Sequence, residues 1–318
     1  MNTEQQQAIA AEVFAALDSG TLELPTLPDM ALKIREAIDD PNVSADKLAN
    51  LLSADPAISA QIIKMANSAT FSGGNTVNDL RTAISRLGYR MLRNLVMTIT
   101  LTNLFKADNP LIRQHLKRLW EHSREVAASS YVLALYQKHL KPEQAMLAGL
   151  IHDIGALPLY IYADRHHPGL DQAALEGLVR KFDGLVGSKL LQNWNFPDEL
   201  VAVVADHENL QRSHDSALPD YVDVVTVANL QLAGSAKFVA WTNVTAAAKL
   251  GYSPIDCQNF LTTHAEQLAA VQGMLGIETA KPAKPASNPI QRPQPTQPTP
   301  KPARHESGFL AKFLRMFK

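Results

Sequence analysis

Apolar residues recur at steps of three and four positions from the start of the chain to about residue 275. This spacing is the period of one face of an α-helix, whereas a strand would show alternation at every second position, which no segment sustains. The sequence therefore predicts an all-α fold in which helices follow one another through short turns.

Two Pro-containing dipeptides mark predicted helix starts. In Asp55-Pro56 the aspartate can cap the helix and the proline suits its first turn, and a new series of helices follows Asn109-Pro110. Asn109-Pro110 is also the predicted boundary between an N-terminal helical lobe, residues 18–109, and a C-terminal lobe, residues 110–278. We expect these lobes to share one apolar interface. Further helices are predicted from Pro142 through LAGLIHDIGALPLY and near residues 172–193, 198–206 and 219–233.

The segment NDLRTAISRLGYRMLRNLVM predicts two helices separated at Gly88, in a left-handed C-cap conformation. A helix-turn-helix reader of DNA is conceivable, because four arginines could share one side of this segment. A solvated charged face is the commoner arrangement, and we favour it. The arginines are Arg81, Arg86, Arg90 and Arg93.

Composition and charge narrow the class of protein. A chain of 318 residues with 46% hydrophobic residues can bury a large core, and its one cysteine, Cys257, suits a reducing compartment. No signal peptide or membrane-spanning run is evident, so we expect a cytoplasmic location. Residues 281–318 hold 8 Lys and Arg and 1 Glu, which leaves the rest with a net charge of about −8. An acidic body disfavours binding to nucleic acid.

Three residues could carry metal chemistry. His122 lies in WEHSREVA, and the pair His152-Asp153 lies inside the apolar run LAGLIHDIGALPLY, both predicted to be helical. Adjacent His and Asp on a helix can approach one ion from neighbouring angles, and a His from an antiparallel helix can close a third side. Such ligands suit Fe, Mn or Zn, which could activate water for phosphoester hydrolysis. A structural role, with Asp153 accepting helix-end amides, is the alternative.

Five motifs occur in an order that resembles the HDOD domain, the HD-related output domain of bacterial regulators. The resemblance covers roughly residues 18–275 and implies two helical lobes, the second related to HD phosphohydrolases. The motifs are LPTLPDMALKIREAI, LLSADPAISAQIIKMANSATFSG, DLRTAISRLGYRMLRNLVM, W-x-H-S-x-x-V-A and AGLIHDIG.

The resemblance also indicates an eroded metal site. Active HD hydrolases carry a His, a His-Asp pair and a distal Asp, and the first three correspond to His122, His152 and Asp153, but the distal position is Asn229. Two further histidine positions of related two-metal proteins correspond here to Asp183 and Asp206. A neutral amide brings no charge to a metal. We therefore expect no resident cofactor, at most a weakly held divalent metal at the first three residues, and no enzymatic activity.

For the other polar residues of the chain we favour ordinary structural roles. Asp183, Asp206 and Asp223 could supply replacement carboxylates if the fold brings them near His152, but solvated or capping roles are favoured. His207 and His214 are expected to be exposed, because their surroundings are polar and turn-like.

Three functions follow from these patterns. The favoured one is a non-catalytic signal-transduction module that binds other signalling proteins. The alternative is a metal-dependent HD-type phosphohydrolase acting on a nucleotide or cyclic dinucleotide. The third, binding to nucleic acid through the helices around Gly88, is disfavoured by the acidic body.

The last 38 residues have a different character. Residues 281–306 contain 8 of the 19 prolines and predict an extended, disordered linker. Residues 307–318 predict a basic amphipathic helix that binds an anionic membrane surface, at the inner face, or a groove on a partner. Its binding residues are Phe309, Leu310, Lys312, Phe313, Leu314, Arg315, Phe317 and Lys318.

The tail gives the first testable prediction. The intact protein should bind anionic vesicles in a salt-sensitive manner, because each basic residue near anionic lipid contributes about 1 kcal/mol and the phenylalanines add apolar burial. Deleting residues 307–318, or Phe313→Glu, should abolish binding in a vesicle co-sedimentation assay without changing the circular dichroism of the domain. Unchanged binding and localisation after the deletion would contradict both the membrane and the partner version.

Overall fold

The computed structural model describes most of the chain up to residue 277. All described residues belong to the first of two compact units, Met1–Thr279 and Ala280–Lys318. The predicted linker of residues 281–306 and amphipathic helix of residues 307–318 lie outside the described residues. The described residues are 3–21, 33–34, 36–38, 40, 43–68, 71, 75–102, 104–105, 109–214, 216–232 and 238–277.

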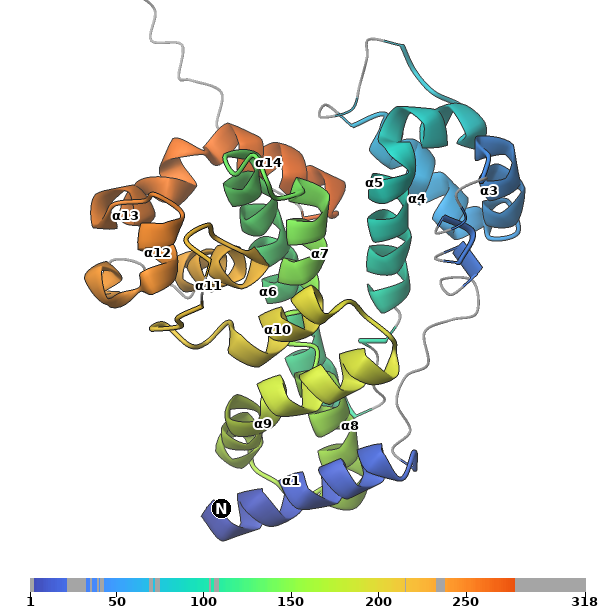
Figure 1. Cartoon of the computed structure of the whole chain (residues 1–318). Helices are drawn as coiled ribbons and strands as arrows, with labels where there is room; N and C mark the ends of the chain where they lie inside the picture. The colour runs from blue at the N-terminus through green and yellow to red at the C-terminus, as the bar shows by residue number, and fades with distance from the viewer. Residues whose placement is uncertain are drawn as a thin grey trace, which may run out of the picture. The chain divides into compact units, whose positions relative to one another are not determined.

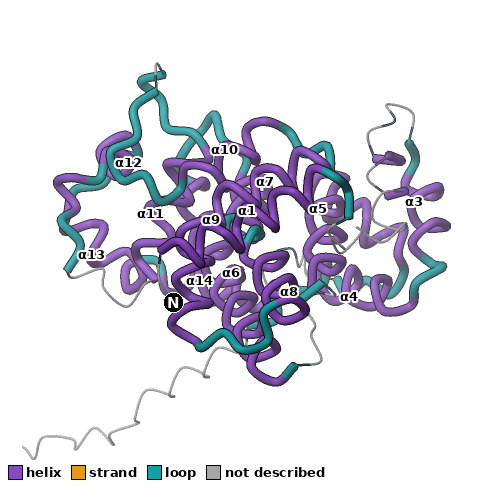
Figure 2. Tube along the Cα trace, turned by 90° about the horizontal axis from the view of Figure 1, so that it is seen from below, coloured by secondary structure: helices purple, strands orange, loops and turns teal. Residues whose placement is uncertain are grey.

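Helices connected by turns make up the described part of the chain, which contains no strand (Figures 1 and 2). The all-α prediction is confirmed. In chain order the elements are α1 (Thr3–Asp18), α3 (Ala45–Leu52), α4 (Pro56–Ala66), α5 (Leu80–Thr102), α6 (Pro110–Leu135), α7 (Pro142–Ile151), α8 (Ala156–His166), α9 (Gln172–Asn193), α10 (Asp198–Asp206), α11 (Tyr221–Leu232), the 3₁₀ turn η1 (Trp241–Asn243), α12 (Thr245–Lys249), α13 (Pro254–Thr263) and α14 (Ala265–Met274).

Helices α3 and α4 pack against α5, and local polar contacts fix their ends. The Asp55 carboxylate accepts a hydrogen bond from the Ile58 amide at 3.0 Å, as expected for the predicted cap of α4. Between α4 and α5, the Asn67 side chain donates to the Val77 carbonyl and accepts from the Val77 amide, at 2.7 and 2.8 Å. These bonds bring the start of α5 back against α4.

Gly88 interrupts α5 as predicted, but in a different conformation. Its φ of 76° is positive and its ψ of 158° is extended, so the residue is not in the left-handed helical region. The prediction of a left-handed C-cap was wrong in this respect. A positive φ still favours glycine, because a Cβ would be strained there. The chain changes direction at this residue and continues as helix from Tyr89 to Thr102.

The most extensive helix–helix contact in the described part joins α6 and α7. Gly149 permits it, because a Cβ at this position would lie 2.8 Å from the Ala127 Cα and 2.7 Å from the Ser130 hydroxyl. Small residues at a helix crossing let the backbones approach closely, and this crossing forms the centre of the C-terminal bundle. Helices α11 and α14 pack on α6, whereas α9 packs on α8 and α10.

Helix α1 lies against the C-terminal bundle although it begins the chain. It contacts α8 and α9 (Figure 1). The Glu12 carboxylate accepts from the Tyr162 hydroxyl at 3.2 Å and lies 2.9 Å from the His167 Nε2, and Asp18 pairs with Lys189 at 2.8 Å. Both predicted lobes omit residues 3–17, and nothing in the apolar period of α1 indicated where it would pack.

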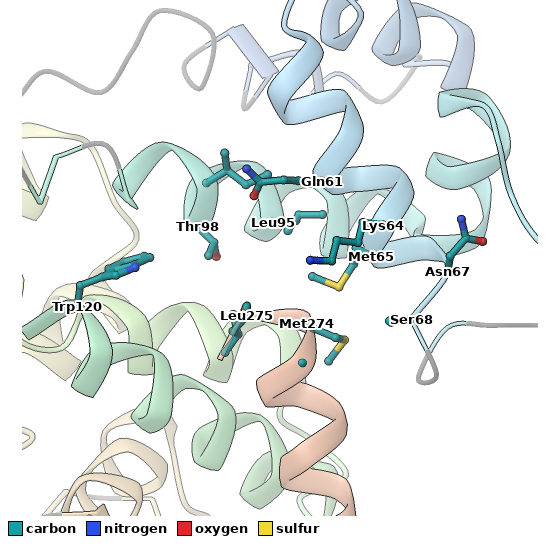
Figure 3. A pocket seen from close by; sticks show the side chains of 13 residues that line it. Gln61, Lys64, Met65, Asn67, Ser68, Leu95, Thr98, Trp120, Met274 and Leu275 are labelled. Carbon is teal, nitrogen blue, oxygen red and sulfur yellow. The ribbon is translucent and has the colours of Figure 1, made fainter. Parts of the chain in front are cut away.

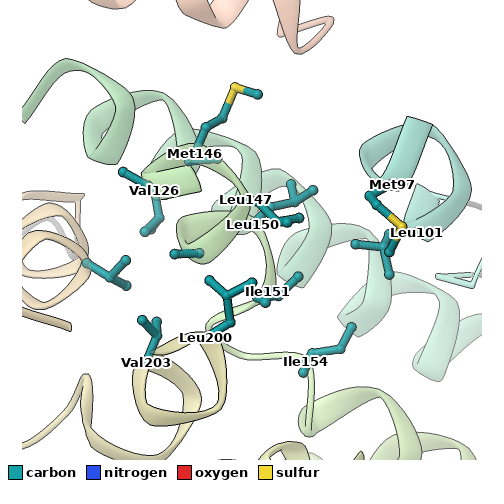
Figure 4. Close-up of a cluster of buried hydrophobic side chains, with 14 of the residues drawn as sticks. Met97, Leu101, Val126, Met146, Leu147, Leu150, Ile151, Ile154, Leu200 and Val203 are labelled. Carbon is teal, nitrogen blue, oxygen red and sulfur yellow. The ribbon is translucent and has the colours of Figure 1, made fainter. Parts of the chain in front are cut away.

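The C-terminal half of α5 connects the N-terminal helices to this bundle. Met97 and Leu101 of α5 lie opposite Leu147 and Leu150 of α7 in one apolar cluster (Figure 4). Beside this cluster, the Asn94 side chain donates to the Glu143 carbonyl at 2.7 Å. All of these side chains belong to the same buried cluster as the rest of the core or border it, so no solvent layer separates the predicted lobes at this point.

One stretch in the described part is long and apolar enough to cross a membrane by length and composition. It is Pro142–His166, in which an 18-residue window has a mean hydropathy of 1.3 and is 83% buried inside the protein. It corresponds to α7, the following turn and α8. Core helices give the same signature, so the stretch is weak evidence for a membrane span.

The shared core predicts that the N-terminal helices α3 to α5 and the C-terminal bundle unfold together. Ile84 is fully buried among the N-terminal helices, whereas Trp120, Trp194 and Trp241 all belong to the C-terminal bundle. Ile84→Ala should lower the free energy of unfolding by about 2–5 kcal/mol. Tryptophan emission and circular dichroism should report the same shift in urea midpoint.

Leu135→Ala serves as the control. Leu135 is 48% exposed near the end of α6, so its truncation should change stability by less than about 1 kcal/mol. A shift in circular dichroism without a shift in tryptophan emission would show that the lobes unfold independently.

Candidate functional site

The HD pair lies at the end of α7 and not inside a continuous helix. Helix α7 ends at Ile151, His152 is its C-cap, and residues 152–155 form the turn that leads into α8. The prediction of one helix through His152 and Asp153 was therefore wrong. His152 is completely buried, and His122 reaches it from the middle of α6, with the two ring centroids 5.2 Å apart.

The Asp153 carboxylate is the centre of the site. One oxygen, Oδ2, lies 3.1 Å from the His152 Nε2 and 3.9 Å from the His122 Nε2. The other oxygen, Oδ1, lies 3.2 Å from the Nε2 of His207. The three residues singled out from the sequence are thus brought together, with ligand atoms within 4.8 Å of one another, and a fourth residue joins them.

His207 was expected in an exposed turn, and that expectation was wrong. It is the C-cap of α10, only 3% exposed, and its ring packs edge-on against His152 at 4.9 Å. The sequence did contain a signal. His207 follows the buried Val203 by four residues, so it continues the apolar face of α10 toward the core.

Both buried histidines have their other ring nitrogen fixed by the backbone. The His152 Nδ1 lies 2.8 Å from the Gly149 carbonyl, and the His207 Nδ1 lies 3.1 Å from the Val203 carbonyl. Because a carbonyl oxygen only accepts, each Nδ1 must be the donor, which directs each Nε2 toward Asp153. Both Nε2 atoms lie within ion-pair distance of the carboxylate, at 3.1 Å for His152 and 3.2 Å for His207. Two buried imidazole nitrogens therefore share one carboxylate.

Asp183 and Asp223 were both expected to be solvated or capping acids; both are buried, and Asp223 accepts a hydrogen bond from the Asp220 backbone amide at the start of α11, at 3.0 Å. Asp183, on α9, is 8% exposed, and its Oδ1 has no hydrogen-bond partner. It occupies the same face of α9 as Val179, Val186 and Leu190, a three- and four-residue spacing that indicated burial. Asp206 is 46% exposed beside Arg212, in agreement with its predicted solvated role.

Asp223 belongs to a separate polar cluster. It is 1% exposed at the start of α11, where the His214 Nε2 lies 3.1 Å from it. Arg212 donates to both oxygens of Asp220, at 3.0 and 2.9 Å. These contacts tie residues 212–223 to α11, and nothing places them beside His152.

Asn229 faces the site from α11, as the resemblance implied. Its Oδ1 lies 3.0 Å from the His122 Nε2. With the amide oxygen in this position it accepts the proton of that nitrogen, so the His122 Nε2 is a donor to Asn229 and not a free lone pair. The residue at the distal position thus holds the first histidine of the site by a neutral hydrogen bond.

Two glycines bring α9 close enough for Asp183 to approach Asp153. A Cβ at Gly155 would overlap the Asp183 carbonyl oxygen and lie 2.5 Å from the Gly187 nitrogen. A Cβ at Gly187 would in turn lie 2.9 Å from the Gly155 nitrogen. Only glycine fits at either position, because backbone faces backbone.

Burial and the charges of neighbouring groups shift the pKa values of the residues in the site in different directions. Burial raises the pKa of Asp183 well above its usual range, and the Asp153 charge raises it further. Burial also opposes ionisation of Asp153, but the imidazoles of His152 and His207 outweigh it and hold the Asp153 pKa well below 3.8. Burial lowers the pKa of His207, yet the hydrogen-bonding and charge of Asp153 prevail and raise it to about 9. Burial lowers the pKa of His122.

The cluster can balance its charge in two ways. A divalent cation could be held by His122, His152, Asp153 and His207, a set of imidazoles and one carboxylate that suits Zn, Fe or Mn. Alternatively, a protonated His207 can compensate the Asp153 charge directly. The two buried Nε2 atoms are compatible with the first arrangement, and the bond between His122 and Asn229 is compatible with the second.

Comparison with known proteins identifies the kind of domain that carries this cluster. A model of the HDOD domain family matches residues 24–210, which is more than half of the chain. A curated protein from Treponema pallidum (strain Nichols), described as uncharacterised, is 24% identical over 245 residues, covering 72% of this chain. The chain corresponds to 45% of the length of that relative.

Solved structures show the same fold. A protein from Shewanella amazonensis SB2B, provisionally named a metal-dependent phosphohydrolase, is 26% identical with a TM-score of 0.74, over 86% of this chain and 100% of that one. An HDOD domain protein of unknown function from Geobacter sulfurreducens is 24% identical with a TM-score of 0.61, over 86% and 99%. A protein from Marinobacter aquaeolei VT8, provisionally named a signal transduction protein, is 21% identical with a TM-score of 0.59, over 87% and 67%.

The close approach of α9 at Gly155 predicts that adding a side chain at this position destabilises the protein. Gly155→Ala should lower the free energy of unfolding by about 3 kcal/mol, because the new methyl group would overlap the backbone of α9. Urea denaturation measures the loss. Gly169→Ala is the matched control, since a Cβ there meets no atom within 4 Å and should change stability little. Equal stability of the two variants would contradict the close approach of α9 to the turn of residues 152–155.

Proposed function

Because this chain belongs to the HDOD domain family, we propose that it is a signalling module that regulates other proteins by binding them and not by hydrolysing a phosphoester. Its fold is that of HD-like phosphohydrolases, and family membership makes it a signalling domain. The absence of catalysis and the mode of action are the proposal.

The hydrogen bond between Asn229 and His122 carries the proposal. In the active HD pattern a carboxylate at this position would add charge to a metal, whereas the amide adds none and takes up the Nε2 of the first histidine. A metal would have to displace this bond to recruit His122. Of the two carboxyl groups nearest the histidines, the raised pKa of Asp183 favours its neutral form, which leaves Asp153 as the one charged ligand.

The cluster also has a way to remain stable without a metal. At neutral pH the pKa of about 9 keeps the buried His207 protonated next to the partly buried Asp153, so this carboxylate has a cationic partner. Breaking such a buried pair would be costly, which gives the residues a structural reason to persist. A metal, when bound, could polarise a phosphoryl oxygen or lower the pKa of a bound water. His122, His152, Asp153 and His207 would hold it, weakly in the absence of a distal carboxylate.

A metal-dependent phosphohydrolase remains the second candidate. The convergence of the His152 and His207 Nε2 atoms on one carboxylate favours it, because imidazole and carboxylate groups together commonly ligate metals. The Shewanella amazonensis structure with a phosphohydrolase name is also among the similar folds. A nucleotide or cyclic dinucleotide would be the substrate class, as the sequence resemblance implies.

The proposed partners are signalling proteins in the cytoplasm. The acidic body argues against nucleic acid as a partner. The basic amphipathic segment of residues 307–318, which lies outside the described residues, would add attachment to an anionic membrane surface or to a groove on a partner. Localisation at the inner face of the membrane would follow from the first of these.

A metal-binding and activity experiment tests the absence of catalysis. Purified protein should not hydrolyse bis-p-nitrophenyl phosphate, nucleotides or cyclic dinucleotides with Mn, Fe, Mg or Zn. Asn229→Asp should raise the affinity for Mn²⁺ by at least about tenfold in calorimetry, since a charged ligand replaces the amide.

Asn243→Asp is the matched control, because it makes the same change in η1, away from the cluster. It should leave Mn²⁺ affinity unchanged. Turnover by the wild-type protein that disappears in His152→Ala would overturn the proposal. Tight Mn²⁺ binding by the wild-type protein, unchanged in Asn229→Asp, would show that Asn229 does not weaken the site.

A further inference from the structure

A cavity of about 440 Å³ lies between the N-terminal helices and the C-terminal bundle, apart from the HD cluster. Helices α4 and α5 form one wall, and α6 and the end of α14 form the other (Figure 3). We propose that this cavity binds a small amphipathic monocarboxylate, a molecule with one apolar body and one anionic head. This inference does not depend on whether the HD cluster is catalytic.

The size of the cavity favours a small molecule over a peptide. Cavities of 300–1,000 Å³ at the junction of domains are typical of small-molecule sites. The occupant is therefore a metabolite-sized compound.

The walls of the cavity are largely apolar. Figure 3 shows Lys64 and Met65 reaching from α4 into the space that Leu275 borders from the opposite side, with Trp120 at one end. Polar side chains occur at a few points, as in sites that orient an apolar ligand. The apolar lining residues are Met65, Leu95, Ile99, Trp120, Met274 and Leu275.

Charge indicates the head group. Among the lining residues that the structure describes, Lys64 is the one charged side chain and there is no carboxylate. A ligand carboxylate could therefore pair with the Lys64 ammonium while its apolar body contacts the rest of the lining.

Hydrogen bonds from Arg124 hold the wall of the cavity that the end of α14 forms. The Arg124 guanidinium of α6 donates to the carbonyl oxygens of Leu275 and Gly276, at 3.2 and 3.0 Å. These carbonyls follow the end of α14, which closes the cavity. A ligand would thus contact α4 and α5 on one side and an anchored wall on the other, so its binding should stabilise the whole unit.

Decanoate and decanol are the probes for the full-length protein. Decanoate should bind saturably in titration calorimetry, raise the thermal unfolding midpoint and change Trp120 emission. Lys64→Met should weaken decanoate binding by about fourfold, as expected for an exposed ion pair, and should leave decanol binding unchanged. Lys117→Met, at an exposed lysine of α6 outside the cavity, is the matched control and should bind both probes normally.

Filling the cavity gives the decisive comparison. Gly273 lines it, and a Cβ there meets no atom within 4 Å, so Gly273→Leu can occupy the space without a backbone clash. This variant should lose decanoate binding, whereas Gly273→Ala should retain it. Gln61→Trp, at an exposed lining position of α4, obstructs the cavity from the other wall and should give the same loss if Gly273→Leu fails to fold. Wild-type affinity in a folded cavity-filling variant would overturn the proposal, as would the absence of saturable binding below millimolar decanoate.

Discussion

The partly buried Asp153 carboxylate, whose side chain is 24% exposed, is the group around which the centre of the C-terminal bundle is arranged. A charge removed from water needs partners, and they come from elements far apart in the chain: His122 from α6, His152 from the end of α7 and His207 from the end of α10. The helices α7 and α10 must end beside Asp153, and α6 must pass close to it, for these histidines to reach the carboxylate. Gly149 lets α6 and α7 approach, and Gly155 with Gly187 lets α9 reach the turn that carries Asp153. The packing of α6, α7, α9 and α10 therefore determines the surroundings of the Asp153 carboxylate.

Much of the fold could be predicted from the sequence because it depends on local signals. The cap at Asp55, the prolines at positions 56 and 110 and the three- and four-residue apolar period located α4, α6, α9 and α10 closely. The pair His152-Asp153 was identified because polar residues inside an apolar run need partners. The predictions failed where a long-range contact decided the outcome. His207 and Asp183 are polar residues on otherwise apolar faces, and both interact with Asp153, which lies 54 and 30 residues away from them in sequence. The packing of α1 on α8 and α9 had no local signal at all.

The proposed function concerns the HD cluster, whereas the proposed ligand binds in the cavity beside Lys64, in another part of the same unit. The HD cluster lies deep in the C-terminal bundle, where His152 and His207 are almost completely buried. The cavity beside Lys64 is bordered by both the N-terminal helices and α14, so it is sensitive to how these elements sit against one another. A signalling domain needs an element whose arrangement a ligand can bias, because a ligand shifts only those states that it binds with different affinity. A contact between two sets of helices meets that requirement better than a rigid buried cluster does.

Electrostatics explains how the cluster could be stable in the non-catalytic module that we propose. The His207 pKa of about 9 lies above its unfolded value of 6.5, so its contribution to stability is complete below that value and disappears as the pH rises through 9. The Asp153 pKa lies below 3.8, so its contribution is present above that value and is lost only as the pH falls through the lowered pKa. Between these limits the pair stabilises the fold without help from a metal. Replacing the distal carboxylate by Asn229 then removes charge from a site that is already compensated, and the amide still anchors His122. On the proposed function, the residues of the cluster persist because the bundle needs the carboxylate and imidazoles to remain paired, whether or not a metal is ever bound.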